Sequence, residues 1–388
     1  MRIATVIERT HAYLCLDCGV CTGSCPVARA NGQFSPRMNV ERTLAGLGGE
    51  VEMDREIWSC TTCGLCAQSC PSVVDYLRFI REARTRSMAG GHSAARKTHA
   101  GVFDSLERLQ AHRDIEVRRP SWVEGDLRVA DSGEWLYFVG CLPIFQGFFG
   151  GRNGDGIGED LLDTARSAVR LLNAAGIVPA VRSDERCCGH DLLWTGDRRS
   201  FESLARANLD MIRRSGARHV VSTCPECVRT LKLDYAEVAG APDIEVLHIS
   251  EAVTRFAGSD RLPSVQGATK PEVAAVTYHD PCRLGRHLGI YAAPRDALRQ
   301  VARVEVLEMA RSRERAACCG TSCWMNCDGF SERMRLERLR EAVATGAETM
   351  VVACPKCQLH FRCTLSNHPE LGIKITELTG LLARRIVR

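Results

Sequence analysis

Cys318-Cys319-Gly320 and its earlier copy Cys187-Cys188-Gly189 decide how this 388-residue chain is organised. Each Cys-Cys-Gly stands between one upstream cysteine and a downstream C-x-x-C pair. Each half thus has five thiols: Cys141, Cys187, Cys188, Cys224 and Cys227 in the first, and Cys282, Cys318, Cys319, Cys354 and Cys357 in the second. Four ligands close a structural zinc site, so a fifth would be left over. Soft thiolates in this number favour an iron–sulfur assembly.

Two cysteine runs ahead of these halves carry the spacing of bacterial ferredoxins. Each reads C-x-x-C-x-x-C-x-x-x-C-P, ending at Pro26 and at Pro71. In this spacing three nearby thiolates bind one cube and the fourth crosses to the neighbouring cube. We therefore predict two [4Fe-4S] cubane clusters, one held by Cys15, Cys18, Cys21 and Cys70 and the other by Cys60, Cys63, Cys66 and Cys25. A zinc ribbon built from the C-x-x-C pairs is the alternative, which the eight-cysteine register disfavours.

The overall composition is that of a soluble globular protein with one anomaly, its 21 cysteines. Hydrophobic residues make up 45% and charged residues 25%, and the net charge of +4 is too small to indicate nucleic-acid binding. We find no signal-peptide pattern and no run of about eighteen apolar residues that could span a bilayer. We therefore expect a cytoplasmic, reduced protein whose cysteines bind metal, with any membrane association arising through a partner.

The chain repeats itself from residue 131 onward. In each half an apolar strand leads to the first cysteine, and another apolar strand runs directly into the C-x-x-C pair. Helical stretches alternate with these strands at 159–175, 198–214, 294–302 and 331–346, a pattern typical of parallel sheets. Ligands bind in loops beyond the carboxyl ends of such strands. We therefore expect the halves to pack as a pseudo-twofold pair, with both metal sites near their junction.

These patterns predict a fold class and a domain order. We expect an α/β protein with a small α-helical ferredoxin domain and two pseudo-symmetric, cysteine-rich α/β half-domains that contain short parallel sheets. A helix is expected at 37–57, and one amphipathic helix around 103–109 within a basic linker. The predicted boundaries are 1–85 for the ferredoxin-like domain, 86–130 for the linker, 131–262 for the first half and 263–388 for the second.

Two ferredoxin runs followed by two Cys-Cys-Gly domains resemble the catalytic subunits of heterodisulfide reductases, in the fused, D-type form. The resemblance covers about residues 12–385. It implies a non-cubane [4Fe-4S] cluster in each half, the first bound by Cys141, Cys187, Cys188, Cys224 and Cys227 and the second by Cys282, Cys318, Cys319, Cys354 and Cys357. In that family such a cluster pair cleaves a mixed disulfide into two thiols, one electron at a time.

The resemblance leaves two functions open. One is a disulfide reductase or thiol-oxidising subunit fed through the cubane clusters. The other is a non-catalytic electron relay, like the iron–sulfur subunits of glycolate, lactate and glycerol-3-phosphate dehydrogenases. Two complete Cys-Cys-Gly motifs favour the first, because the relay relatives often lack part of one. The chain has no glycine-rich dinucleotide fingerprint. We therefore expect a flavoprotein subunit or a membrane cytochrome b as electron partner, and a small disulfide or thiol as substrate.

Several residues beside these motifs are further candidates. His190, after the first Cys-Cys-Gly, and His279, ahead of Cys282, could protonate a departing thiolate. Each could instead cap a loop or hydrogen-bond a cluster sulfide. Cys323 and Cys327 could be extra ligands, a redox pair or buried small residues, and Cys363 is interpreted as structural.

Overall fold

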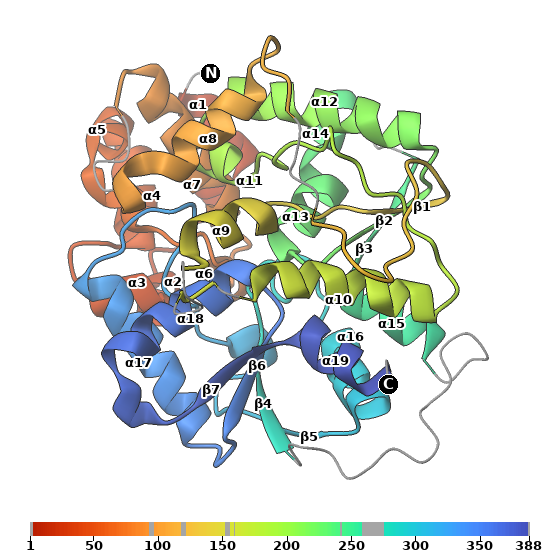
Figure 1. The fold of residues 1–388 in the computed structure, drawn as a ribbon. Coiled ribbons are helices and arrows are strands. Elements are labelled where there is room, and N and C mark those ends of the chain that lie inside the picture. The colour runs from red at the N-terminus through yellow and green to blue at the C-terminus, as the bar shows by residue number, and fades with distance from the viewer. Residues whose placement is uncertain are drawn as a thin grey trace.

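The computed structural model describes residues 3–92, 97–117, 122–151, 156–158, 160–240, 243–257 and 275–386. They form three regions that lie against one another. In Figure 1 the N-terminal helices occupy the upper left, a first parallel sheet the upper right, and a second parallel sheet the lower half.

Residues 3–92 form helices and turns without a strand. The α-helices are α1 (Ile3–Arg9), α2 (Val20–Ser24), α3 (Pro26–Ala30), α4 (Pro36–Arg42), α5 (Gly48–Met53), α6 (Leu65–Gln68) and α7 (Tyr76–Ala89). The single helix predicted at 37–57 is wrong in one respect, since the chain is interrupted between α4 and α5. Gly46 adopts φ 86° there, a left-handed conformation that glycine reaches without steric cost.

Each cysteine-rich half contains a short parallel sheet. The first has the order β1 (Trp135–Tyr137), β2 (His219–Ser222), β3 (Glu245–His248), and the second has the order β5 (Glu305–Leu307), β4 (Ala275–His279), β6 (Thr349–Val352), β7 (Lys374–Glu377). All strand pairs are parallel. Ala180 bridges to Leu136 on β1, the position that β5 occupies beside β4. Corresponding strands thus follow the same order, and the predicted short parallel sheets are confirmed.

Helices of the two halves meet in exchanged pairs. The helices are α10 (Leu161–Ala174), α12 (Arg198–Ser215) and α15 (Ile249–Phe256) in the first half, and α16 (Ala292–Ala297), α17 (Gly329–Val343), α18 (Pro355–Asn367) and α19 (Leu378–Ile386) in the second. Helix α10 packs on α19, and α15 packs on α16. Each pair therefore joins a helix that follows the first strand of one half to the last helix of the other half. This exchange is consistent with a pseudo-twofold arrangement of two repeats.

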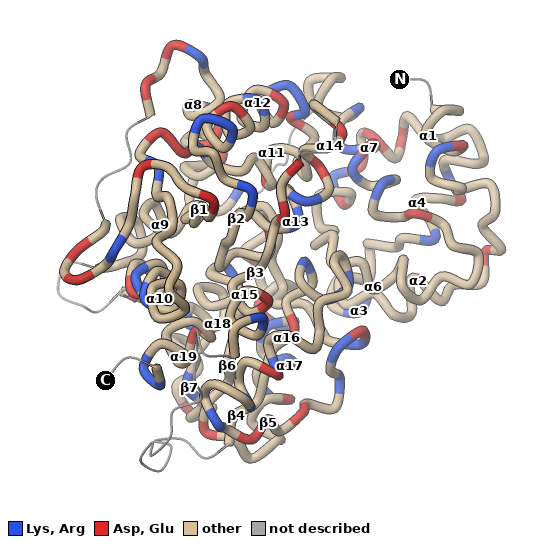
Figure 2. Tube along the Cα trace, turned by 90° about the vertical axis from the view of Figure 1, so that its right-hand side faces the viewer, with Lys and Arg blue, Asp and Glu red and all other residues tan. Residues whose placement is uncertain are grey.

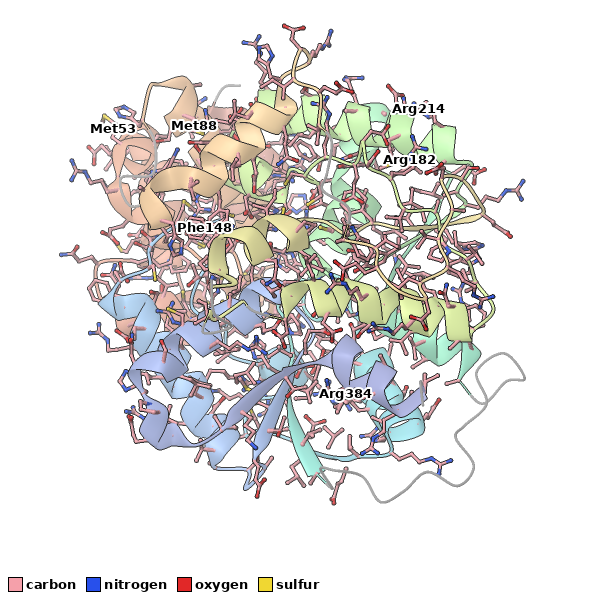
Figure 3. The ribbon with its side chains drawn as sticks, in the orientation of Figure 1. Met53, Met88, Phe148, Arg182, Arg214 and Arg384 are labelled. Atoms are coloured by element: carbon pink, nitrogen blue, oxygen red, sulfur yellow. The ribbon has the colours of Figure 1, made fainter. Side chains whose placement is uncertain are left out.

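Two more helices cover the junction. Helix α8 (Val102–Ala111) lies within the stretch predicted as a linker, and α9 (Leu142–Phe149) follows Cys141. Phe103 of α8 stacks on Trp324 at a centroid distance of 4.2 Å. Phe148 of α9 also packs against Phe103, and Figure 3 shows it on this face, below Met88 at the end of α7.

The predicted domain boundaries remain predictions, and the boundary at 262/263 lies outside the described residues. None of the helices in the described ranges is long and apolar enough to cross a membrane.

Candidate iron–sulfur centres

Four of the ten thiols in the two Cys-Cys-Gly halves follow the ends of parallel strands, two in each sheet. Cys141 and Cys224 come shortly after β1 and β2, and Cys282 and Cys354 come shortly after β4 and β6. Cys224 and Cys354 are also N-caps, each followed by a proline at the first helical position, where a missing N–H costs nothing. A helix N-terminus favours negative charge, and this suits thiolate ligands.

In the first half the five thiols form a continuous chain of contacts. The Sγ atoms of Cys141 and Cys187 are 3.7 Å apart. Cys187 contacts Cys188, Cys188 contacts Cys227, and Cys227 contacts Cys224. All five line one cavity, which also receives Glu107 and Lys356. The structure therefore brings the predicted first set together.

The second half repeats this chain in the same order. Cys282 contacts Cys318, Cys318 contacts Cys319, Cys319 contacts Cys357, and Cys357 contacts Cys354. His360 of α18 adds a ring nitrogen, Nδ1, 3.6 Å from the Cys319 sulfur. Two sets of five thiols in equivalent contact orders are what a duplicated metal site requires.

Steric constraints explain why a glycine follows each cysteine pair. Gly189 and Gly320 adopt φ values of 80° and 85°, in the left-handed region that favours glycine. A Cβ on Gly320 would lie 2.6 Å from the Ser331 carbonyl oxygen, and one on Gly189 would lie 2.8 Å from the Phe201 ring. Both turns hold the paired cysteines against the helix packed behind them.

Cysteines from the two ferredoxin runs lie close together across the runs, and the assignment of each to one cluster stays a prediction. Cys15 and Cys70 lie close enough to Cys21 to raise its pKa by charge repulsion, and Cys60 and Cys63 do the same to Cys25. Burial is the largest cause that raises the pKa of both Cys21 and Cys25. Cys18 is exposed, whereas Cys25, Cys60, Cys63 and Cys66 are buried. The first group therefore lies nearer the surface than the second.

A direct contact joins the second ferredoxin group to the second Cys-Cys-Gly half. The Cys63 and Cys318 thiols lie next to each other, and each shifts the pKa of the other. Arg283 donates to the backbone oxygen of Thr62 and, at 2.6 Å, to its hydroxyl. Arg286 donates to the Cys63 carbonyl at 2.7 Å. The two regions are thus fastened together next to their thiols.

A buried charge cluster lies where the two halves meet. The residue directly before the last cysteine of the C-x-x-C motif is Glu226 in the first half and Lys356 in the second. Lys356 Nζ lies 2.7 Å from Glu226 and 2.5 Å from Asp191, and all three side chains are at most 11% exposed. The cluster therefore bridges the repeats through equivalent positions of their motifs.

Both candidate histidines are buried and accept a hydrogen bond from an arginine. His190 Nε2 accepts from Arg283 Nε at 2.9 Å, and His190 Nδ1 lies 2.7 Å from Asp191. His279 Nδ1 accepts from Arg338 at 3.1 Å, and burial together with this guanidinium lowers the pKa of His279 to about 3. These contacts hold the rings in fixed orientations, and their proton transfer stays a prediction.

The three remaining cysteines differ in their burial. Cys323 is buried near His190 and Asp191, Cys327 is exposed, and Cys363 is half-buried. The sequence analysis missed Glu107, a buried glutamate of α8 beside the first set of thiols. Burial, reinforced by Asp191, raises the pKa of Glu107 well above its ordinary value. The four-residue spacing of Phe103, Glu107 and Ala111 on one helix face indicates that Glu107 is buried, but it does not connect Glu107 with the thiols.

Known protein families match both parts of this arrangement. The 4Fe-4S dicluster domain matches residues 11–74, and the cysteine-rich domain CCG matches residues 135–232 and 276–362. The chain therefore contains a 4Fe-4S dicluster domain followed by two CCG domains. The predicted [4Fe-4S] cofactors and redox electron-transfer function agree with these domains.

Named relatives extend the likeness over nearly the whole chain. The D-type subunit of the dihydromethanophenazine:CoB–CoM heterodisulfide reductase from Methanosarcina barkeri is 28% identical, over 91% of this chain and 89% of that protein. Its counterpart from Methanosarcina acetivorans is 29% identical over the same shares. One subunit of a fumarate reductase (CoM/CoB) from Methanothermobacter marburgensis is 25% identical, over 95% of this chain and 71% of that protein. The predicted resemblance to heterodisulfide reductases is confirmed.

Proposed function

We propose that this chain reduces a small disulfide, or oxidises the corresponding thiols, at its CCG sites, using electrons that pass through the ferredoxin clusters. The observation that carries the proposal is the completeness of both five-thiol sets together with the contact between Cys63 and Cys318. A non-catalytic electron relay would be the better interpretation if one thiol set were incomplete, or if the ferredoxin region lay away from the CCG thiols.

The donor sets fit the proposed groups. Cys15, Cys18, Cys21 and Cys70, and Cys60, Cys63, Cys66 and Cys25, would hold two cubanes, and the two sets of five would hold the non-cubane clusters. When bound, these clusters would carry single electrons and offer Lewis-acidic iron to a substrate sulfur. The protein itself excludes water from the site, because the side chains of Trp194 and Trp324 are at most 5% exposed beside it. Arg283 and Arg338 orient His190 and His279.

The order of the thiol groups supports a direction for electron entry. The group with exposed Cys18 would receive electrons, the second ferredoxin group would pass them on, and the set with Cys318 would take them next. Exposed apolar side chains surround the outer group, among them Leu16 at 72% and Val73 at 69%. Asp17 is the one charged residue from 12 to 28, and the trace near α2 is mostly uncharged in Figure 2. We place the flavoprotein or membrane cytochrome b partner there.

Iron and acid-labile sulfide per chain, measured after anaerobic purification, test the proposal. Two cubanes alone give about eight irons, so a loaded protein contains clearly more. Adding substrate thiol under oxidising conditions is then expected to produce a new EPR signal. A content of about eight irons, with no thiol-dependent signal, would contradict the proposal.

The second candidate function is a non-catalytic relay within a larger redox complex. Relatives described as a probable membrane-anchored ferredoxin from Chromohalobacter salexigens (28% identical) and an EtfAB:quinone oxidoreductase from Syntrophomonas wolfei (29% identical) favour it. This chain matches 55% and 30% of those proteins, respectively. This relay function would be supported if the CCG sites contain iron and their EPR spectra do not change when thiols or disulfides are added.

A further inference from the structure

We propose that Glu107 supplies an oxygen ligand to iron at the first CCG site, so that the two CCG sites differ in their donor atoms. The inference rests on the proposed function to the extent that the first site must hold iron. It adds a residue from outside the CCG domain, on the helix predicted to belong to a linker.

The geometry places the carboxylate among the thiols. One oxygen of Glu107 and the sulfurs of Cys141 and Cys187 all lie within 4.8 Å of one another. Glu107 lines the same cavity as all five thiols of the first set. Ligand atoms at such mutual distances can bind one metal ion, and iron accepts carboxylate oxygen beside other donors.

Glu107 is buried without a full set of protein partners. Its side chain is 5% exposed, and its Oε2 atom has no hydrogen-bond partner among the described residues. The nearby cation, Lys356, already pairs with Asp191 and Glu226. A buried carboxyl without a partner is costly, and a bound ion is one of the few explanations for such a group. Iron in the cavity would supply the missing partner.

The helix that carries Glu107 is fixed to the site. Gln110 of α8 accepts a hydrogen bond from the Cys187 backbone N–H at 2.9 Å, and the Gln110 carbonyl accepts one from Arg186. Phe103 and Ala111 bury the same helix face four residues before and after Glu107. The carboxylate therefore enters the cavity from a helix docked on the Cys-Cys-Gly turn, and an apolar residue would satisfy packing alone.

The second site has a different neighbour at its thiols. There His360 Nδ1 lies 3.6 Å from the Cys319 sulfur, within hydrogen-bond distance. An anionic ligand at the first site would lower the reduction potential of its iron, whereas a hydrogen bond to sulfur would raise that of the second. Two sites with otherwise equivalent thiols would thus differ in potential.

Mössbauer spectroscopy of protein enriched in ⁵⁷Fe tests the inference. The wild-type spectrum is expected to contain an iron component with the higher isomer shift of mixed sulfur and oxygen coordination. Glu107→Gln should lose this component and shift the midpoint potential of the first site upward, while the cubane EPR signals persist. Glu107→Asp, which keeps a carboxylate, should retain part of it. Asp104→Asn on the same helix is the matched control, since Asp104 pairs with Lys97 and Arg108, and it should leave the spectrum unchanged.

The outcomes separate the inference from the proposed function. Loaded CCG sites with identical spectra in wild type and Glu107→Gln would overturn the ligand role, because glutamine keeps no anionic oxygen there. If the glutamine variant does not fold, the wild-type spectrum decides, and iron coordinated by sulfur alone overturns the role. A wild-type protein that contains only cubane iron overturns the inference and the proposed function together.

Discussion

At the junction of the halves, we expect replacement of Lys356 to lower the stability of the folded protein more than any other single change. Replacement with glutamine would leave Asp191 and Glu226 buried without their cation. Removing one partner of a buried ion pair costs about 3–5 kcal/mol, so we expect a clear fall in the melting temperature measured anaerobically by calorimetry. Arg213→Ala is the control, because its pair with Asp210 is at least 60% exposed on both sides. Equal effects of the two changes would contradict the assigned role.

The second CCG site can be removed separately by one thiol. Cys319→Ala is expected to abolish the EPR signal of that site and to leave the cubane signals intact, since Cys319 contacts Cys318 and Cys357 but belongs to neither ferredoxin group. Cys327→Ala, at an exposed cysteine, should change neither signal. Loss of every signal in Cys319→Ala would show that the sites do not load independently.

Residues with a fixed spacing could be predicted from the sequence, and residues that act through tertiary contacts could not. Eight thiols in the ferredoxin register can bind clusters in few ways, so their grouping could be predicted directly. Glu107 lies 34 positions before Cys141, and no local pattern connects the two. The Glu226–Lys356 pair likewise depends on how the halves meet, although both residues stand in recognised motifs.

At the scale of single elements, the Cys-Cys-Gly turns should tolerate no side chain at the glycine. Gly320→Ala combines left-handed backbone strain with a Cβ 2.6 Å from a carbonyl oxygen. Gly216→Ala is the matched control, since it has φ 73° with no atom within 4 Å of the added Cβ, and should cost only about 1 kcal/mol. Thermal unfolding should show a distinctly larger loss for Gly320→Ala, and a similar loss in both would contradict the steric argument.

Alternation and periodicity predicted most elements near their observed places. The helices expected at 159–175 and 198–214 appear as α10 and α12. The stretch at 294–302 is helical throughout, as the last four residues of α16 and a π-helix at Leu298–Ala302. Such irregular turns depend on packing against neighbouring elements, which a single-sequence pattern does not record.

On the scale of the whole molecule, the apolar core continues across the predicted domain boundaries. One cluster of buried residues runs from Val6 in α1 through Val220 in β2 to Ile375 in β7, and a second runs from Phe103 to Ala383. Arg84 of α7 adds hydrogen bonds to Cys60 and Trp194 backbone oxygens at 2.7 and 2.9 Å. The three regions are therefore expected to unfold as one unit.

Truncation tests this shared core. A fragment of residues 1–262 would expose the faces of α10 and α15 that pack on α19 and α16, and such large apolar faces promote aggregation. We expect it to be insoluble or to unfold without a cooperative transition in calorimetry. Co-expression with residues 263–388 should restore a soluble complex. A soluble fragment that melts cooperatively by itself would contradict the prediction.

The charge pair at the junction also bears on how the duplicated halves diverged. Glu226 and Lys356 occupy equivalent positions of the two motifs and lie 2.7 Å apart. A symmetric dimer of one ancestral half would place glutamate against glutamate, or lysine against lysine. The present pair could therefore form only after duplication, once each copy could mutate separately. At this position the two halves are therefore complementary rather than interchangeable.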